Sequence, residues 1–176
     1  MPAPYFPTCR DSTGVDWDYN SMSRKKIAKR IISPDPVYDN IVLSKFINQV
    51  MRKGKKILAR RIVYQALDII KEKTKKEPLE VFDKALKNAS PLLEVKSKRI
   101  GGANYQVPRE VRGERKLTLA MRWIIQGANE KKGKPMRAKL AEEMIDAASN
   151  TGWAVRKKEN THRMAEANRA FAHFAW

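Results

Sequence analysis

His162 is the side chain that comes nearest to a catalytic or metal-binding arrangement. Glu159 and Glu166 lie three residues before it and four residues after it, so all three would share one face of a helix. Such a cluster could hold a metal ion or act as an acid–base pair. The same glutamates can instead pair with Arg163 and Arg169, and no further His or Cys completes a site. We therefore predict a structural role for His162, no metal or other cofactor, and no enzymatic activity.

The turn at residues 52–56, Arg-Lys-Gly-Lys-Lys, is the second place where side chains could do chemistry. Gly-Lys is part of the phosphate-binding loop of nucleotide hydrolases. Here, however, Gln49 stands where that loop needs its first glycine, and no Ser or Thr follows the lysine. A tight turn between helices still exposes basic side chains and backbone N–H groups together. The turn therefore predicts phosphate contact without nucleotide hydrolysis.

The charge balance indicates a polyanionic partner. The 176 residues include 37 Lys and Arg against 19 Asp and Glu, which gives a net charge of +18. The positive groups repel one another unless an anion neutralises them. Nucleic acid is the expected partner. A membrane surface is a poorer candidate, because the sequence has no apolar run of about eighteen residues. Cys9 is the single cysteine, which excludes a disulfide framework within the chain.

Residues 95–108, VKSKRIGGANYQVP, predict a β-hairpin. Gly101 and Gly102 supply the positive φ angles of a two-residue turn, which would place Lys98 opposite Tyr105. In this register the apolar residues do not share one face. We therefore expect a ribbon that leaves the body with neither face fully buried.

The predicted ribbon carries an unusual amount of positive charge. Its basic residues are Lys96, Lys98, Arg99, Arg109 and Arg112. Tyr105 could stack on a nucleic-acid base. The alternative is a solvated surface hairpin whose lysines only discourage edge-to-edge aggregation.

The rest of the sequence predicts helices. Apolar residues recur with the 3.6-residue period of an amphipathic helix in six segments. The first opens at Asp35-Pro36 and ends near Gly54, since Asp can cap a helix and Pro can occupy its first turn. The other five cover about 58–70, 78–91, 117–128, 135–152 and 164–175. The predicted fold is mainly α: a six-helix bundle-like body with a protruding two-stranded antiparallel β-ribbon at about 92–112.

The chain divides into three parts by composition. Residues 1–21 contain prolines and no apolar periodicity, which predicts a disordered leader. Residues 22–34 form a basic N-terminal arm that carries Arg24, Lys25, Lys26, Lys29 and Arg30. Residues 35–176 are expected to fold as a single helical RNA-binding domain.

Further basic clusters accompany the later helices. Trp123 is expected in the core, and the neighbouring Arg122 could either bind RNA or form a salt bridge. The following turn has Lys131, Lys132, Lys134 and Arg137, and the predicted last helix is preceded by Arg156, Lys157 and Lys158. Each cluster alone could be a solvated surface. Together with the ribbon they suggest that basic groups converge on an irregular, folded polyanion.

Two other classes of protein are possible for a basic, mainly helical chain. A helical DNA-binding or chromatin protein should present a recognition helix or dimer symmetry. An RNA-processing nuclease should present a carboxylate or histidine cluster. Neither feature is identified in the sequence, which favours a noncatalytic RNA-binding protein.

The sequence also resembles a known family. The strings that carry the resemblance are PDP at 34–36, GKK at 54–56, VKSKRIGGANYQVPREV at 95–111, AMRW at 120–123 and THRMAEANRAFAHF at 161–174. Their order and spacing are similar to those of the bacterial-type small-subunit ribosomal protein seven family, over residues 22–176. The string RRIVYQALDIIKEKT is most similar to cyanobacterial and plastid members. The resemblance therefore implies a ribosomal protein of the bacterial cytoplasm or the plastid stroma.

The family's known role sets further expectations. The resemblance implies binding to the 3′ major domain of small-subunit rRNA, nucleation of head assembly, and a place near the exit-site tRNA and the mRNA exit path. Head and platform ribosomal proteins of the small subunit would be its neighbours. Members of the family are not enzymes.

The resemblance and the basic clusters described above together assign residues to each partner. The rRNA-facing candidates are the basic residues of the arm, Arg52, Lys53, Lys55, Lys56, the basic residues of the ribbon with Gly101, Gly102 and Tyr105, then Arg115, Lys116, Arg122, Lys131, Lys132, Lys134 and Arg137. The tRNA- and mRNA-facing candidates are Arg99, Gly101, Gly102, Asn104, Arg156, Lys157, Lys158, His162 and Arg163. Three features depart from the family pattern: the leader has no counterpart, Arg109 adds a charge, and Ala175 replaces a basic residue near the C-terminus.

Overall fold

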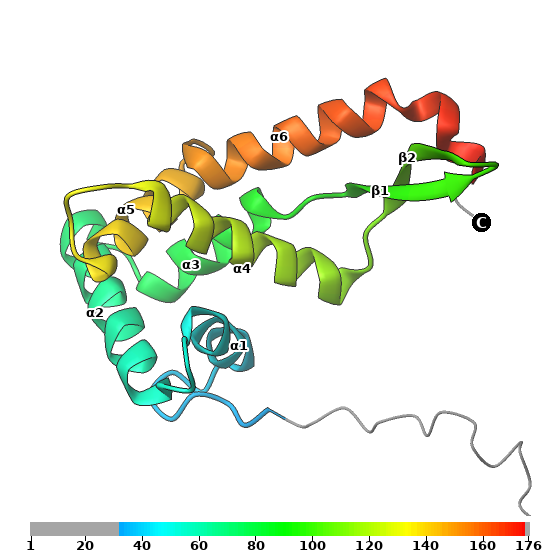
Figure 1. Cartoon of the computed structure of the whole chain (residues 1–176). Helices are drawn as coiled ribbons and strands as arrows, with labels where there is room; N and C mark the ends of the chain where they lie inside the picture. Colours follow the sequence, from blue (N-terminus) through cyan, green and yellow to red (C-terminus); the bar gives the residue numbers. More distant parts are fainter. Residues whose placement is uncertain (1–31, 175–176) are drawn as a thin grey trace, which may run out of the picture. The chain divides into compact units, whose positions relative to one another are not determined.

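The computed structural model describes residues 32–174, which form a mostly helical body with one β-hairpin (Figure 1). The elements in order are α1 (Ile41–Val50), α2 (Lys56–Thr74), α3 (Pro78–Ala89), β1 (Leu93–Ile100), β2 (Ala103–Glu110), α4 (Gly113–Glu130), α5 (Met136–Ala148), α6 (Gly152–Ala167) and the 3-10 helix η2 (Arg169–Phe174). The predicted mainly α class and the two-stranded antiparallel ribbon are confirmed. The leader, residues 22–31 of the arm and Ala175 lie outside the described residues. Within residues 32–174, no helix is long and apolar enough to cross a membrane.

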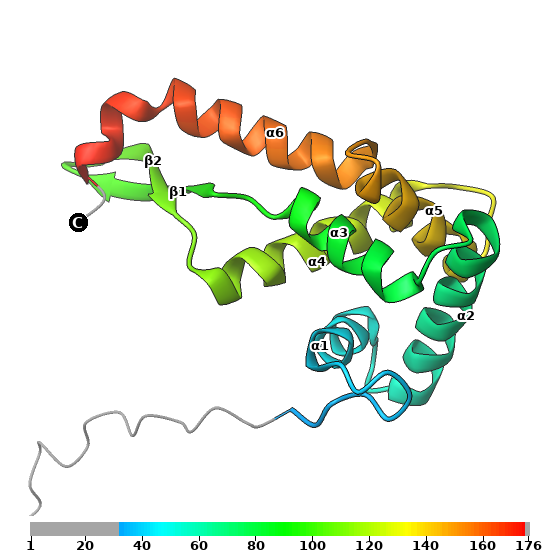
Figure 2. The same ribbon diagram turned by 180° about the vertical axis from the view of Figure 1, so that it is seen from behind.

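The hydrophobic core lies between the helices. α5 packs against α2, α3, α4 and α6, and α2 lies at the opposite end of the body from the β-ribbon (Figure 2). Phe46 of α1 and Phe82 of α3 are fully buried and meet edge to face, with ring centroids 5.3 Å apart. Trp123 of α4 is 8% exposed, which confirms its predicted place in the core.

α1 begins at Ile41, so the prediction of a helix opening at Asp35-Pro36 is wrong. Asn40 caps α1, because its side-chain oxygen accepts hydrogen bonds of 2.7 and 3.3 Å from two backbone N–H groups of the helix. Asp39 has a φ of 46°, which no α-helix can include. Asp35 instead caps a separate turn, and its buried carboxylate accepts a hydrogen bond of 2.7 Å from the Tyr64 hydroxyl on α2.

α6 begins at Gly152, so the prediction of a last helix starting near residue 164 is also wrong. The basic residues 156–158 lie inside this helix and do not precede it. Met164, an apolar residue at the start of the predicted last helix, is 49% exposed. The residues that α6 buries are Ala154, Val155, Thr161 and Ala165. Small or polar side chains such as these give little apolar periodicity, which explains the error.

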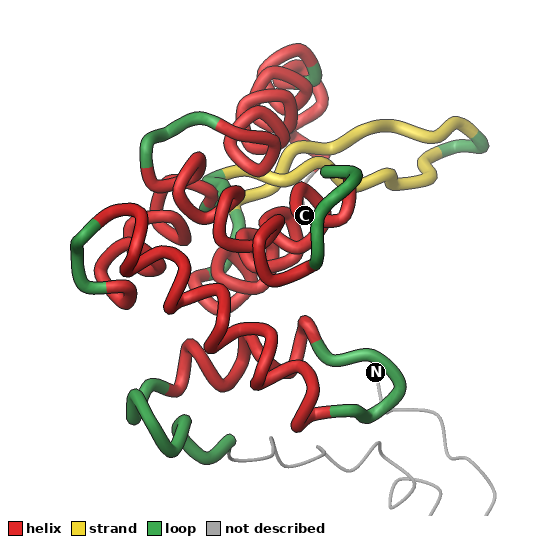
Figure 3. Tube along the Cα trace, turned by 90° about the vertical axis from the view of Figure 1, so that its left-hand side faces the viewer, coloured by secondary structure: helices red, strands yellow, loops and turns green. Residues whose placement is uncertain are grey.

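The β-ribbon has the predicted register, with Lys98 opposite Tyr105. Gly101 and Gly102 have φ angles of 56° and 92°, as a two-residue primed turn requires. The strands extend beyond the helices at their tip (Figure 3), but they also run alongside α6 and η2. Val107 is 1% exposed, so one side of the ribbon is covered where a largely exposed ribbon was predicted.

Candidate nucleic-acid interface

The turn between α1 and α2 gathers three basic side chains. Lys53 and Gly54 have φ angles of 51° and 74°, and the Lys55 N–H donates to the Arg52 carbonyl at 3.1 Å. Two central residues with positive φ form a tight primed turn, which reverses the chain within four residues. Arg52 and Lys53 therefore lie on one side of the turn, and Lys55 lies on the other. The left-handed conformation of Lys53 costs about 1 kcal/mol or more, because its Cβ atom disfavours it.

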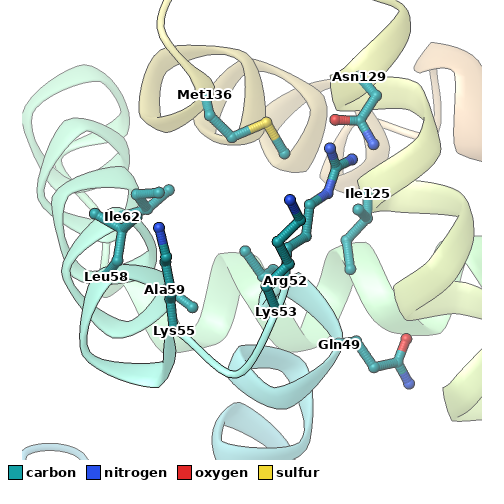
Figure 4. Close-up of a pocket in the computed structure, with 11 residues that line it drawn as sticks. Gln49, Arg52, Lys53, Lys55, Leu58, Ala59, Ile62, Ile125, Asn129 and Met136 are labelled. Atoms are coloured by element: carbon teal, nitrogen blue, oxygen red, sulfur yellow. The ribbon is translucent and has the colours of Figure 1, made fainter.

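A hollow of about 600 Å³ lies beneath this turn. Its apolar walls come from α1, α2, α4 and α5, through Val50, Leu58, Ala59, Ile62, Ile125 and Met136. The side chains of Arg52, Lys53 and Lys55 stand around it, and Met136 lies across the opening from them (Figure 4). The site thus combines apolar walls with a basic rim.

The three basic residues of the rim keep their charges available. Arg52, Lys53 and Lys55 are exposed. Within the part of the chain that the structure describes, none of them forms an ion pair. Each can therefore contact a phosphate without first giving up a carboxylate partner, as an electrostatic nucleic-acid site needs.

Lys131 and Lys134, by contrast, are engaged with carboxylates. Lys131 Nζ lies 2.7 Å from Asp146 Oδ2 and 3.1 Å from the fully buried Glu143. Burial works to lower the pKa of Lys131, but its hydrogen bonds to Asp146 and Glu143 outweigh this effect and raise the pKa. Lys134 Nζ lies 2.6 Å from Glu142 and lowers the pKa of that carboxyl group. An RNA phosphate would have to displace these carboxylates, so the arrangement favours a structural role for Lys131.

Several exposed polar residues of the ribbon lie at its tip. Arg99 and Asn104 face each other beside the glycine turn, and both are exposed. Lys96 is exposed and lies 3.7 Å from Glu94, which Arg115 also contacts at 3.3 Å. Exposed pairs of this kind contribute about 0–1 kcal/mol, so Lys96 and Arg115 can exchange them for a phosphate at little cost.

η2 braces the middle of the ribbon. Lys98 Nζ donates to the backbone carbonyl of Phe174 at 3.1 Å. The Tyr105 ring centroid lies 5.3 Å from that of Phe171 and 5.6 Å from that of Phe174. The Tyr105 ring, which could have stacked on an RNA base, thus already packs on aromatic side chains of the protein. The bracing fixes the direction in which the tip points.

His162 joins α6 to the entry of the ribbon. Its Nε2 accepts a hydrogen bond of 3.0 Å from the Leu92 N–H. Burial lowers the pKa of His162, and the charge of Lys158 lowers it further. The neutral imidazole, which can accept this bond, is therefore favoured. Among residues 32–174 no group of three or more His, Cys, Asp or Glu side chains could hold a metal ion, and the geometry supports the structural interpretation.

The remaining predicted residues are distributed over several surfaces. Those that are exposed are Lys56, Arg112, Arg122, Lys132, Arg156, Lys157 and Arg163, together with Gly101 and Gly102. Arg137 donates to the Gln65 side chain at 3.3 Å, and Lys158 donates to the Asn88 carbonyl at 2.6 Å. Lys116 is partly buried at the start of α4. Arg24, Lys25, Lys26, Lys29 and Arg30 lie outside the described residues.

Sequence reasoning missed the walls of the hollow and one basic residue near the ribbon. Ile125 and Met136 are far from the basic turn in sequence, and no local pattern connects them to it. A second hollow, of about 840 Å³, lies between the base of the ribbon, α6 and η2. Arg169 lines it together with Arg109 and Arg112. The error in placing α6 concealed this position of Arg169.

Comparison with known proteins agrees with the resemblance seen in the sequence. The family profile described as Ribosomal protein S7p/S5e matches residues 22–169. Small ribosomal subunit protein uS7 of Pelotomaculum thermopropionicum is 63% identical over 153 residues, which cover 87% of this chain and 98% of that protein. The protein of the same name from Thermotoga maritima is 59% identical over 155 residues, which cover 88% of this chain and all of that protein. The chain therefore belongs to the ribosomal protein S7p/S5e family.

Proposed function

We propose that this protein is a structural component of the small ribosomal subunit that acts by binding ribosomal RNA and catalyses no reaction. The α1–α2 turn carries the proposal, because three cations without ion-pair partners among the described residues surround one site there. Phosphates neutralise such cations and release counterions, which drives association. Binding to RNA would also neutralise the net charge of +18. The name of the relatives, small ribosomal subunit protein uS7, supports this role.

The RNA partner is the 3′ major domain of small-subunit rRNA, and binding nucleates assembly of the subunit head. The family resemblance supports this assignment, and the α1–α2 turn with the basic arm supplies the cations for it. The ribosome is of the bacterial type, in a bacterial cytoplasm or a plastid stroma. The relatives described above support the bacterial alternative.

The ribbon and α6 face the exit-site tRNA and the mRNA exit path. Arg99 and Asn104 at the tip, and Arg156 and Arg163 on α6, are exposed and available for such contacts. The contacts of Tyr105 with η2 support this role, because a braced ribbon holds its tip at a fixed place. Ribosomal proteins of the head and the platform are its neighbours.

Sedimentation of the native protein tests this function. In a lysate of the source cells, the protein should travel with small subunits and with whole ribosomes through a sucrose gradient. Washing with high salt should release it without degrading the rRNA. A protein found only in the soluble fractions, or RNA cleavage that disappears in His162→Ala, would reject the proposal.

A further inference from the structure

The hollow beneath the α1–α2 turn offers more than positive charge. Its volume of about 600 Å³ lies within the range of small-ligand sites, about 300–1,000 Å³. Leu58, Ile62, Ile125 and Met136 give it apolar walls, and Leu58 is half exposed, at 50%. Phosphate contact alone needs no apolar cavity, since exposed cations suffice for it. The apolar walls therefore favour a ligand in which an apolar group accompanies the phosphates.

The rim is arranged for a ligand that has negative charge on both sides. Arg52 and Lys53 flank the hollow from one side and Lys55 from the other (Figure 4). Lys53 keeps a left-handed backbone, with a φ of 51°, where glycine would be unstrained. Strain of this kind is concentrated at binding sites. The amide side chains of Gln49 and Asn129 also line the hollow, and amides can both donate and accept hydrogen bonds.

We propose that the hollow receives one unstacked nucleobase of the bound RNA, while Arg52, Lys53 and Lys55 hold the phosphates on either side of it. The inference rests on the proposed function, since it names the part of the RNA that this site takes. Proteins that recognise RNA by sequence bind bases of loops and bulges, which can be turned out of the stack. A base has apolar faces for the walls and polar edges for the amides, and its nucleotide carries the negative charge that the rim requires.

A matched pair of tryptophan variants tests the site. Leu58→Trp places an indole at the hollow, whereas Ile57→Trp adds the same group one residue away, at a position that is 79% exposed and outside the walls. Leu58→Trp should bind an rRNA 3′-domain fragment about tenfold more weakly, as expected when one base loses its contacts. The salt dependence should stay unchanged, because no cation is lost. Ile57→Trp should bind like the wild type, and both variants should melt within a few degrees of it.

Nuclear magnetic resonance of the full-length protein provides a second measurement. With ¹³C-labelled methionine methyl groups, and with the Met136 signal assigned through Met136→Leu, the rRNA fragment should shift the Met136 methyl signal upfield, because a base lies against it. Polyphosphate, which can occupy only the basic rim, should leave the signal nearly in place. Adenosine monophosphate at the same concentration of nucleotide should also leave it in place, because the site needs phosphates on both sides.

The outcomes separate this inference from the proposed function. If wild-type protein binds the rRNA but the Met136 signal does not move, or Leu58→Trp binds as well as Ile57→Trp, the hollow takes no base. If adenosine monophosphate alone gives the full shift, the site binds free nucleotides and the inference is overturned. A wild type that does not bind the rRNA at all would contradict the proposed function itself.

Discussion

Among single residues, the buried carboxylate of Asp35 fixes the segment that precedes α1. Asp35 is 2% exposed, and its carboxylate accepts the 2.7 Å hydrogen bond from the Tyr64 hydroxyl. The backbone N–H groups of Val37 and Tyr38 point to the same carboxylate oxygen at 3.4 Å. A buried carboxylate needs such donors, because their hydrogen bonds replace those that water would form with an exposed carboxylate. Asp35 therefore holds the segment between the N-terminal arm and α1 onto α2.

Removing the Tyr64 hydroxyl should weaken this attachment. Tyr64→Phe should lower the free energy of unfolding by about 1–3 kcal/mol, because the buried Asp35 carboxylate loses a short hydrogen bond. Urea denaturation measures the effect. Tyr38→Phe is the matched control, since the Tyr38 ring contacts that of Tyr64 edge to face, at 5.9 Å. Equal losses in the two variants would show that the hydrogen bond between the Tyr64 hydroxyl and Asp35 adds no stability of its own.

His162 should give the fold a dependence on pH. Its pKa is lowered by burial and by Lys158, so the unfolded chain takes up a proton at this position more readily than the folded one. The stability that neutral His162 provides is present above the unfolded pKa of about 6.5, and it is lost as the pH falls through the folded pKa. Denaturation at several pH values should therefore show a loss of stability below about pH 6.5 that His162→Gln reduces. A pH profile unchanged in His162→Gln would contradict this prediction.

At the scale of elements, the sequence allowed the ribbon to be predicted in detail but not its support. The register followed from Gly101-Gly102, because glycine readily adopts the positive φ angles that a two-residue primed turn requires. The last predicted helix, at about 164–175, covers the residues of η2, but the contact of Phe171 and Phe174 with Tyr105 was missed, since it joins positions far apart in the chain. The start of α6 was misplaced because its buried residues are mostly small. The basic rim of the hollow was predicted as a phosphate-binding turn. Its apolar walls could not be predicted, because they come from four helices.

The charges of the ribbon should matter for RNA and little for folding. Changing Lys96, Lys98 and Arg99 together to Ala should make the slope of log affinity against log salt shallower by roughly two to three units, because about three phosphate contacts are lost. The melting temperature should fall only slightly, through the hydrogen bond between Lys98 and the Phe174 carbonyl. A salt series and thermal melting followed by circular dichroism provide the two values. A large fall in melting temperature, or wild-type affinity at every salt concentration, would show that the ribbon is not an RNA-contacting arm.

At the scale of the whole molecule, positive charge exceeds what the protein can neutralise internally. Within the described region, carboxylates engage Lys73, Lys96, Arg115, Lys131 and Lys134. The α1–α2 turn has no such partner there, and residues 22–31 add five more cations. The family profile begins at residue 22, so residues 1–21, with three aspartates and one arginine, lie outside the matched region. We therefore expect residues 22–174 to account for RNA binding.

Two truncations test that division. Removing residues 1–21 should leave the melting temperature and the rRNA affinity nearly unchanged, because the segment opposes the charge of the rest. Removing residues 1–31 should also leave folding intact but should make the salt slope shallower by about four units, since the five basic residues of 22–31 are then lost as well. A several-degree fall in melting temperature in the shorter truncation would show that residues 1–21 pack on the body.

We expect this protein to bind small-subunit rRNA electrostatically and without catalysis, and the decisive measurement is the salt dependence of that binding. With about eight to ten phosphates neutralised, log affinity for a 3′-domain rRNA fragment should fall with log salt at a slope of roughly −6 to −9. Random duplex DNA should compete poorly at physiological salt, and the RNA should remain intact. A slope near zero, or equal affinity for the duplex DNA, would contradict the account.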